Sequence, residues 1–117
     1  MKNIVLIGMP GCGKTTFGRA LAERLHRPFI DADAYLEEKE GRTIQSFFAE
    51  SEKAFRDAEE RTVEDLSARQ GLIIATGGGV VKRQSNVVKL HASGLIIFID
   101  RRAEDIVTDV EVEKRPL

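Results

Sequence analysis

The stretch GMPGCGKTT, residues 8–16, follows an apolar run at residues 4–7 and opens an amphipathic segment. This order predicts a strand, a phosphate-binding loop and a helix. Glycines allow backbone N–H groups to turn toward a polyphosphate, the Lys14 ammonium reaches the outer phosphates, and the Thr15 hydroxyl can bind Mg²⁺. An ordinary glycine-rich turn is the alternative, but the flanking strand and helix are the context that the motif demands. The expected nucleotide-binding residues are Gly11, Cys12, Gly13, Lys14, Thr15 and Thr16.

Length and charge limit the classes of protein that fit. The chain has 117 residues, one cysteine and a formal net charge of −1, which predicts a single domain over residues 1–117. This charge provides no field that attracts nucleic acid or an anionic membrane, so we expect small anionic ligands as partners. No apolar stretch approaches the roughly 20 residues of a membrane span, and the N-terminus runs directly into a strand. A cytoplasmic protein with a reduced Cys12 is expected.

Apolar runs alternate with helical patterns along the chain, which predicts βαβ units and a parallel sheet. Gly41 and Gly71 are expected to end two of the helices. The predicted strands are residues 3–8, 29–31, 72–76 and 95–99. The predicted helices are residues 14–26, 34–40, 44–49, 52–70, 86–91 and 102–110.

Two carboxylates, Asp31 and Asp33, follow the second predicted strand. Ligands of open parallel sheets lie beyond the carboxyl ends of the strands, and residues two apart on an extended segment point to the same side. Asp31 is suited to hold Mg²⁺ through a water. Asp33 could accept a proton from an attacking hydroxyl or orient it. Asp33 is also suited to cap the helix at residues 34–40, and the two roles are compatible.

Arg56 lies near the start of the long predicted helix, in a run of charged residues. Such a run often forms a solvated face with i,i+4 ion pairs, for example Glu52 with Arg56. Asp57 with Arg61 would be a second pair of this kind. Alternatively, the Arg56 guanidinium could bind a substrate carboxylate through two parallel hydrogen bonds, with Glu59 holding it in place.

Three consecutive glycines, Gly77, Gly78 and Gly79, follow the third predicted strand. Consecutive glycines cost backbone entropy, so they are expected where a ligand or another segment approaches the main chain closely. A plain flexible turn is the alternative. We expect this backbone to contact the ligand.

Other polar residues are expected to have structural roles. Asp100, after the fourth predicted strand, is either a magnesium-associated aspartate or a helix N-cap, and we favour the cap because Asp31 already takes the metal role. His26 and His91 fall at predicted helix ends, where they would cap carbonyls.

Five motifs occur in order along the chain: the loop at residues 8–16, Asp31 to Asp33, the Arg56 cluster (Glu52, Phe55, Arg56 and Glu59), Thr76 to Gly79, and Arg115-Pro116-Leu117. In this order and at these intervals, they resemble the bacterial shikimate kinases over essentially the whole chain. The resemblance implies a P-loop three-layer α/β/α fold with a central parallel sheet of order 2-3-1-4. It also implies transfer of the γ-phosphate of ATP, with Mg²⁺, to the 3-hydroxyl of shikimate in the pathway to chorismate and aromatic amino acids.

The resemblance further implies roles on the substrate side. Asp33 would contact the shikimate hydroxyls and act as the base, and Arg56 would bind the shikimate carboxylate. Gly78, with its neighbours Gly77 and Gly79, would contact the ring hydroxyls.

On the nucleotide side, the resemblance implies that Thr15 and Asp31 hold Mg²⁺ and that Arg115 meets the ATP phosphates. Lys14, Asp33 and Arg115 would be the catalytic residues. The family often has an arginine that packs on adenine seven residues before the arginine corresponding to Arg115, and Thr108 occupies that position here.

Shikimate kinases normally continue past the Arg-Pro-Leu motif into a lid, a fifth strand and a C-terminal helix, whereas this sequence stops at Leu117. A C-terminally incomplete domain with severely reduced activity is therefore expected. A complete enzyme would be a monomer, and an open sheet edge here would offer a surface for self-association. The alternatives are a weakly active module that binds nucleotide or shikimate, and a related small-molecule kinase such as gluconate kinase.

Overall fold

The structure, a computed structural model, describes residues 2–8 and 13–99 of the chain. Within these residues the strands form one parallel sheet in the order β2-β3-β1-β4. The strands are β1 (Asn3–Gly8), β2 (Phe29–Asp31), β3 (Ile73–Gly77) and β4 (Gly94–Ile99). The expected α/β class and strand order are confirmed.

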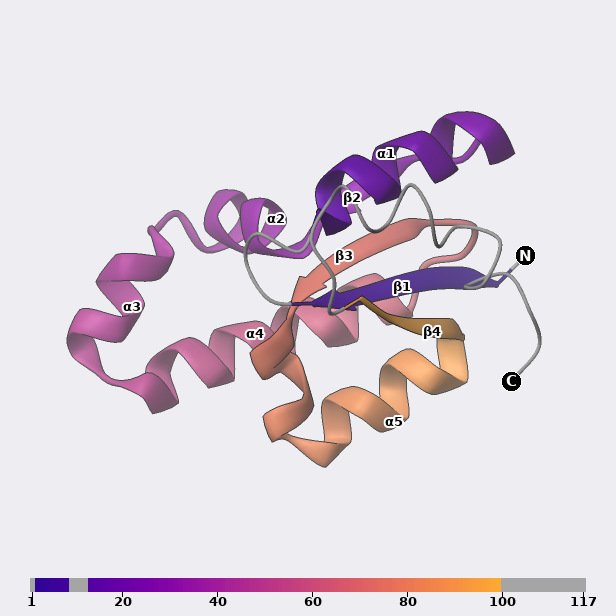
Figure 1. Cartoon of the computed structure of the whole chain (residues 1–117). Coiled ribbons are helices and arrows are strands. Elements are labelled where there is room, and N and C mark those ends of the chain that lie inside the picture. Colours follow the sequence, from indigo (N-terminus) through magenta and orange to yellow (C-terminus); the bar gives the residue numbers. More distant parts are fainter. Residues whose placement is uncertain (1, 9–12, 100–117) are drawn as a thin grey trace.

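Helices cover both faces of this sheet (Figure 1). Their bounds are Lys14–Leu25 for α1, Ala32–Glu40 for α2, Ile44–Glu50 for α3, Glu52–Ser67 for α4 and Gln84–Ser93 for α5. Helix α1 lies on one face, and α4 and α5 lie on the other. Helices α2 and α3 extend from one end of the sheet beside α4. A short 3₁₀ helix, η1 (Gly78–Lys82), joins β3 to α5.

The central strands are buried on both faces because successive side chains of a strand point to opposite sides. Val5 and Ile74 pack toward α4 and α5, where Leu66 and Leu90 complete the cluster. Leu6 and its neighbours on the other face pack with residues of α1. Two helical layers with the sheet between them confirm the predicted three-layer α/β/α arrangement.

Several element boundaries differ from the sequence prediction. Helix α4 ends at Ser67 and not at residue 70, and Gly71 lies in the turn that follows, with a left-handed φ of 78°. Gly41 ends α2 in the left-handed conformation, as predicted. His26 ends α1 in the same conformation and caps it through its backbone N–H. The predicted helix at residues 102–110 and Asp100 lie outside the described residues.

Strand β4 forms one edge of the described sheet, and its residues Leu95 and Phe98 are 58% and 60% exposed. The prediction that this edge supports self-association stays a prediction. In residues 2–8 and 13–99, no helix combines the length and the apolar character that crossing a membrane requires.

Replacing Gly94 by Ala is expected to lower the free energy of unfolding by about 3 kcal/mol, the upper end for overpacking. Gly94 is the register partner of Asn3, and a Cβ added at Gly94 would lie 1.9 Å from the Asn3 carbonyl oxygen. The side chain of Asn3 is itself fixed, because it bonds Arg69 O and Leu72 N. Urea unfolding measures the change.

Gly41→Ala provides the matched control for this prediction. Gly41 has φ 69°, but nothing lies within 4 Å of a Cβ added there. Its expected cost is therefore only the left-handed backbone penalty, roughly 1 kcal/mol. A Gly94→Ala chain that unfolds at the same urea concentration as Gly41→Ala would contradict the close approach of β1 and β4.

Candidate active site

The polar residues singled out in the sequence gather at the carboxyl ends of β1, β2 and β3. In the register, Gly8 pairs with Gly77 and Asp31 pairs with Ala75. Because β3 lies between β1 and β2, the starts of α1, α2 and η1 share one end of the sheet. This is the end at which ligands bind in open parallel sheets.

The start of α1 provides an anion-binding geometry. Gly13 adopts a left-handed φ of 83° immediately before Lys14, and no side chain caps this helix end. The first helical hydrogen bond runs from Phe17 N to Gly13 O at 2.9 Å. The preceding N–H groups of the first turn have no intrahelical acceptor and can therefore donate to a phosphate. Two of the predicted nucleotide-binding residues, Gly11 and Cys12, lie outside the described residues, as does Arg115.

The two aspartates have different local roles from those considered in the sequence. Strand β2 ends at Asp31, whose Oδ1 accepts hydrogen bonds from Asp33 N at 2.9 Å and Ala34 N at 3.3 Å. Asp31 is thus the N-cap of α2, so the alternative role considered for Asp33, capping this helix, is taken by Asp31. The helix begins at Ala32 because the Asp31 side chain satisfies its first free N–H groups. Asp33 lies in the first helical turn, and not on an extension of the strand.

Asp33 is half-buried beside the glycine segment, which consists of Gly77, Gly78 and Gly79. The Oδ2 atom of Asp33 would lie 4.0 Å from a Cβ added at Gly77. Burial raises the pKa of Asp33, and the neighbouring Asp31 carboxylate raises the pKa further. Lys14 and Arg56 act in the opposite direction on this pKa. A carboxylate whose charge is poorly solvated and which has cations nearby is suited to exchange a proton with a ligand.

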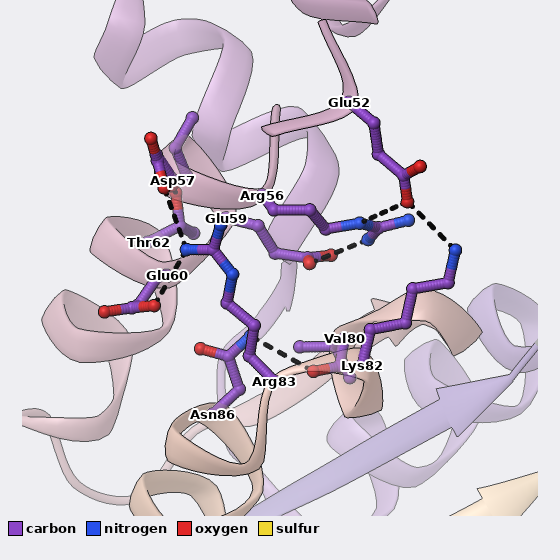
Figure 2. A network of polar contacts seen from close by, with 11 residues as sticks. Glu52, Arg56, Asp57, Glu59, Glu60, Thr62, Val80, Lys82, Arg83 and Asn86 are labelled. Atoms are coloured by element: carbon purple, nitrogen blue, oxygen red, sulfur yellow. Dashed lines mark hydrogen bonds and ion pairs between the residues drawn. The ribbon is translucent and has the colours of Figure 1, made fainter. Parts of the chain in front are cut away.

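Arg56 projects from α4 between Glu52 and Glu59 (Figure 2), and its guanidinium lies against the backbone of Gly79. Its Nη1 donates to Glu59 Oε1 at 2.9 Å, and its Nε lies 3.5 Å from Glu52 Oε2. The Arg56 and Glu59 side chains are only 13% and 9% exposed. A Cβ added at Gly79 would lie 2.6 Å from Arg56 Nη2 and 2.7 Å from Nη1. The glycine at position 79 is therefore required for the guanidinium to lie against this backbone.

Aromatic rings complete the surroundings of the guanidinium. Its Cζ lies 4.9 Å from the Phe55 ring centroid and 5.9 Å from that of Phe48, and these two rings stack on each other. Burial raises the pKa of Glu59, while its hydrogen bond from Arg56 acts in the opposite direction. The arrangement leaves a cation with restricted motion, which can bind a planar carboxylate with little loss of entropy.

Helix α2, which carries Asp33, is anchored to α4 by polar contacts. Arg61 donates to both Glu40 oxygens, at 3.0 and 2.9 Å, and Asp57 pairs with Lys53 and Arg83. Of the two i,i+4 pairs considered for a solvated face, the structure therefore has the pair of Glu52 with Arg56, at 3.5 Å, in place of the pair of Asp57 with Arg61. The Tyr35 hydroxyl donates to Asp65. These contacts bridge residues 21 to 30 positions apart, which local spacing on one helix could not indicate.

Three further residues beside the site, Lys82, Arg83 and Asn86, were not predicted from the sequence. Lys82 Nζ donates to Glu52 at 3.0 Å, and Arg83 Nη1 contacts α4 carboxylates. Asn86 is fully buried, and its Nδ2 donates to Val80 O at 3.1 Å. The available signal was an adjacent Lys-Arg pair that begins three residues after the last of the three glycines.

In the part of the chain that the structure describes, no group of three or more His, Cys, Asp or Glu side chains is arranged to hold a metal ion. This agrees with the chemistry expected here, because Mg²⁺ bound with a nucleotide takes one or two protein oxygens and completes its shell with phosphates and waters. Thr15 at the start of α1 and Asp31 at the end of β2 stay the predicted ligands. Asp31 Oδ1 already accepts two backbone hydrogen bonds, which hold the carboxylate in a fixed orientation.

Comparisons with known proteins agree on one family. A family model described as shikimate kinase matches residues 10–117. A shikimate kinase of Clostridium botulinum (strain Eklund 17B / Type B) is 49% identical over 118 residues, which cover 100% of this chain and 72% of that protein. One of Vibrio parahaemolyticus is 42% identical, over 99% of this chain and 69% of that protein.

A solved structure of the shikimate kinase from Acinetobacter baumannii in complex with shikimate has a TM-score of 0.83 and 38% identity to this chain. It covers 100% of this chain and 66% of its own chain. The shikimate kinase of Aquifex aeolicus gives a TM-score of 0.78 and 33% identity, over 90% of this chain and 63% of that chain. The present chain thus spans only part of the length of each of these relatives.

Proposed function

Because the chain belongs to the shikimate kinase family, we propose that it transfers the γ-phosphoryl group of ATP to the 3-hydroxyl of shikimate. The observation that carries this proposal is the Arg56 guanidinium, held between Glu59 and the Gly79 backbone near Asp33 and Lys14. A kinase for a hydroxylated acid requires a cation that binds the substrate carboxylate, a partly buried protein carboxylate that accepts a proton, and a helix end that binds phosphate.

On the nucleotide side, residues 11–16 bind the ATP phosphates through backbone N–H groups, and Lys14 binds the outer phosphates. Thr15 and Asp31 hold Mg²⁺, which neutralises charge on the transferred group. Arg115 belongs to the same proposal as a second cation for the phosphates.

On the acceptor side, Arg56 binds the shikimate carboxylate with two parallel hydrogen bonds, the geometry that guanidinium and carboxylate share. Backbone groups of Gly77, Gly78 and Gly79 bind ring hydroxyls. Asp33 accepts the proton of the attacking hydroxyl, so that the developing alkoxide attacks the γ-phosphorus as the bond to ADP breaks.

The biological setting belongs to the same proposal. The enzyme acts in the cytoplasm, in aromatic amino-acid biosynthesis, without nucleic-acid or membrane partners, and as a monomer. The net charge of −1 agrees with small anionic ligands and not with a polyanion surface.

The first test is shikimate-dependent ADP formation by the 117-residue chain with Mg²⁺ and ATP. We expect turnover with shikimate and none above background with gluconate, because Arg56 and the glycine segment together select a carboxylate beside ring hydroxyls. Calorimetric binding of shikimate and of MgATP accompanies the assay. Binding of both without turnover would contradict the activity but leave the site assignments intact, whereas absence of both would contradict the whole proposal.

Gly79→Ala is expected to raise the KM for shikimate by about 10- to 100-fold, the cost of a disturbed hydrogen bond to a charged group. The added Cβ would displace the Arg56 guanidinium, which lies within 2.7 Å of it. The KM for ATP should stay unchanged. Gly77→Ala is the comparison, because the nearest atom to its Cβ is 4.0 Å away. Equal increases in the two variants would contradict the role given to the contact between Gly79 and Arg56.

A further inference from the structure

The position of the glycine segment against Arg56 depends on how η1 is held. This 3₁₀ helix is five residues long, and 3₁₀ hydrogen bonds have poorer geometry than those of an α-helix. Contacts from side chains must therefore contribute to its position. The buried Asn86 amide donates to Val80 O, next to Gly79. This bond fixes η1 against α5, but it does not connect η1 to α4, which carries Arg56.

Two adjacent cations make that connection (Figure 2). Lys82 Nζ lies 3.0 Å from Glu52 Oε2, the same carboxylate oxygen that Arg56 Nε approaches. Arg83 Nη1 lies 2.9 Å from Asp57 Oδ1 and 3.0 Å from Glu60 Oε1. The Arg83 bridge is the better shielded of the two, since its side chain is 30% exposed and that of Lys82 is 59% exposed.

Arg83 contacts α4 at two residues that are chain neighbours of Arg56 and of Glu59. Asp57 directly follows Arg56, and Glu60 directly follows Glu59. The charge of Arg83 also opposes the effect of burial on the pKa of Glu59, which favours the ionised form that accepts the hydrogen bond from Arg56. One side chain therefore acts on both the backbone and the carboxylate that confine this guanidinium.

Resting on the function proposed above, we infer that Arg83 is a positioning residue for substrate binding. By bridging Asp57 and Glu60, it holds the segment at Gly79 against Arg56 and thereby sets the geometry of the carboxylate-binding site.

The expected effect is on ligand binding more than on folding. Ion pairs whose members are about one third exposed contribute little to global stability, because solvent screens them. A displacement of about 1 Å in a binding group can nevertheless change a rate by large factors. The contact between the Gly79 backbone and the guanidinium leaves no space for such a displacement without loss of fit.

The test compares Arg83→Met and Arg83→Lys with Lys89→Met as the matched control. Lys89 pairs with Glu64 at 3.2 Å and also joins α5 to α4, but Glu64 is not one of the residues that hold the Arg56 guanidinium. Arg83→Met should raise the KM for shikimate by about three- to tenfold. The value of kcat and the KM for ATP should change by less than about twofold. In Arg83→Lys, the KM for shikimate should stay close to the wild-type value, because the lysine ammonium can still contact an α4 carboxylate.

Lys89→Met should leave all of these parameters unchanged. An unchanged shikimate KM in Arg83→Met, or an equal increase in Lys89→Met, would overturn the inference. A second measurement does not depend on turnover: the ¹⁵N–¹H signals of the Gly79 amide and the Arg56 Nε–H in the ligand-free chain. Both signals should shift in Arg83→Met and not in Lys89→Met, and the absence of any shift would overturn the inference. Failure of the wild-type chain to bind shikimate would instead overturn the proposed function.

Discussion

Asp33→Asn is expected to lower kcat for shikimate phosphorylation by about 100- to 10,000-fold, the contribution of a positioned general base. Asparagine keeps the shape of the side chain and its place in the first turn of α2, but it cannot accept the proton of the attacking hydroxyl. Binding of shikimate should change much less than kcat, since Arg56 and the glycine segment remain. Steady-state assays together with calorimetry separate the two effects.

The same variant should remain folded, and the sign of its stability change can be derived. The pKa of Asp33 is raised in the folded chain, chiefly by burial. The folded state therefore binds this proton more tightly than the unfolded state, and stability falls as the pH rises through the window from the ordinary to the raised pKa. Above that window, the full free-energy cost of burying the ionised Asp33 carboxylate is present. Because asparagine carries no charge to bury, the variant should melt at the wild-type temperature or higher at neutral pH.

Glu38→Gln is the control, because Glu38 is an exposed carboxylate on the same helix. It should leave kcat and the melting temperature unchanged. For the wild-type chain, kcat/KM should fall toward acidic pH with a midpoint above the ordinary pKa of an aspartate. Wild-type activity in Asp33→Asn would contradict the assignment of Asp33 as the base, and an unfolded Asp33→Asn chain would contradict the predicted stability.

The fold was predictable because its signals are local and periodic. The apolar runs at residues 3–8 and 29–31 became strands with the predicted bounds, and Gly41 ended α2 in the left-handed conformation. The site could be located because chain order and the rule for parallel sheets place strand ends together. Gly79 could be assigned a close approach because three glycines cost entropy, although the sequence did not reveal that the approaching group is Arg56.

What the sequence could not provide is the choice among competing partners. Asp31 and Asp33 are chemically equal candidates for the cap of α2. Because β2 ends at Asp31 and α2 begins at the next residue, Asp31 forms the cap. Asp57 had a suitable partner four residues away in Arg61, but it pairs with Lys53 and Arg83. Pairs within a helix and pairs between elements differ little in energy at a surface, so only the packing of η1 and α2 against α4 determines which one forms.

Lys14→Met is expected to lower kcat/KM for ATP by about 100- to 1,000-fold, the usual cost of removing one group that stabilises transition-state charge. Lys14 begins α1 directly after the left-handed Gly13, where the backbone N–H groups can still bind phosphate. Residual nucleotide binding is therefore expected, with the larger loss in the transition state, where charge on the transferred group develops. Arg24→Gln, which removes an exposed positive charge from the last turn of the same helix, should leave the rate unchanged.

Lys14 should also act on the base, and this second effect distinguishes its position from a general loss of positive charge. Its charge lowers the pKa of Asp33, against the effect of burial. Without Lys14, the pKa of Asp33 should rise further, so the acidic limb of the kcat/KM profile should move to higher pH in Lys14→Met and stay in place in Arg24→Gln. Calorimetric shikimate binding in the absence of nucleotide should stay within about threefold of wild type, since Arg56 provides the carboxylate contact. A profile that keeps its midpoint while the rate falls would show that Lys14 and Asp33 act in separate places, which would contradict a single site at the ends of β1, β2 and β3.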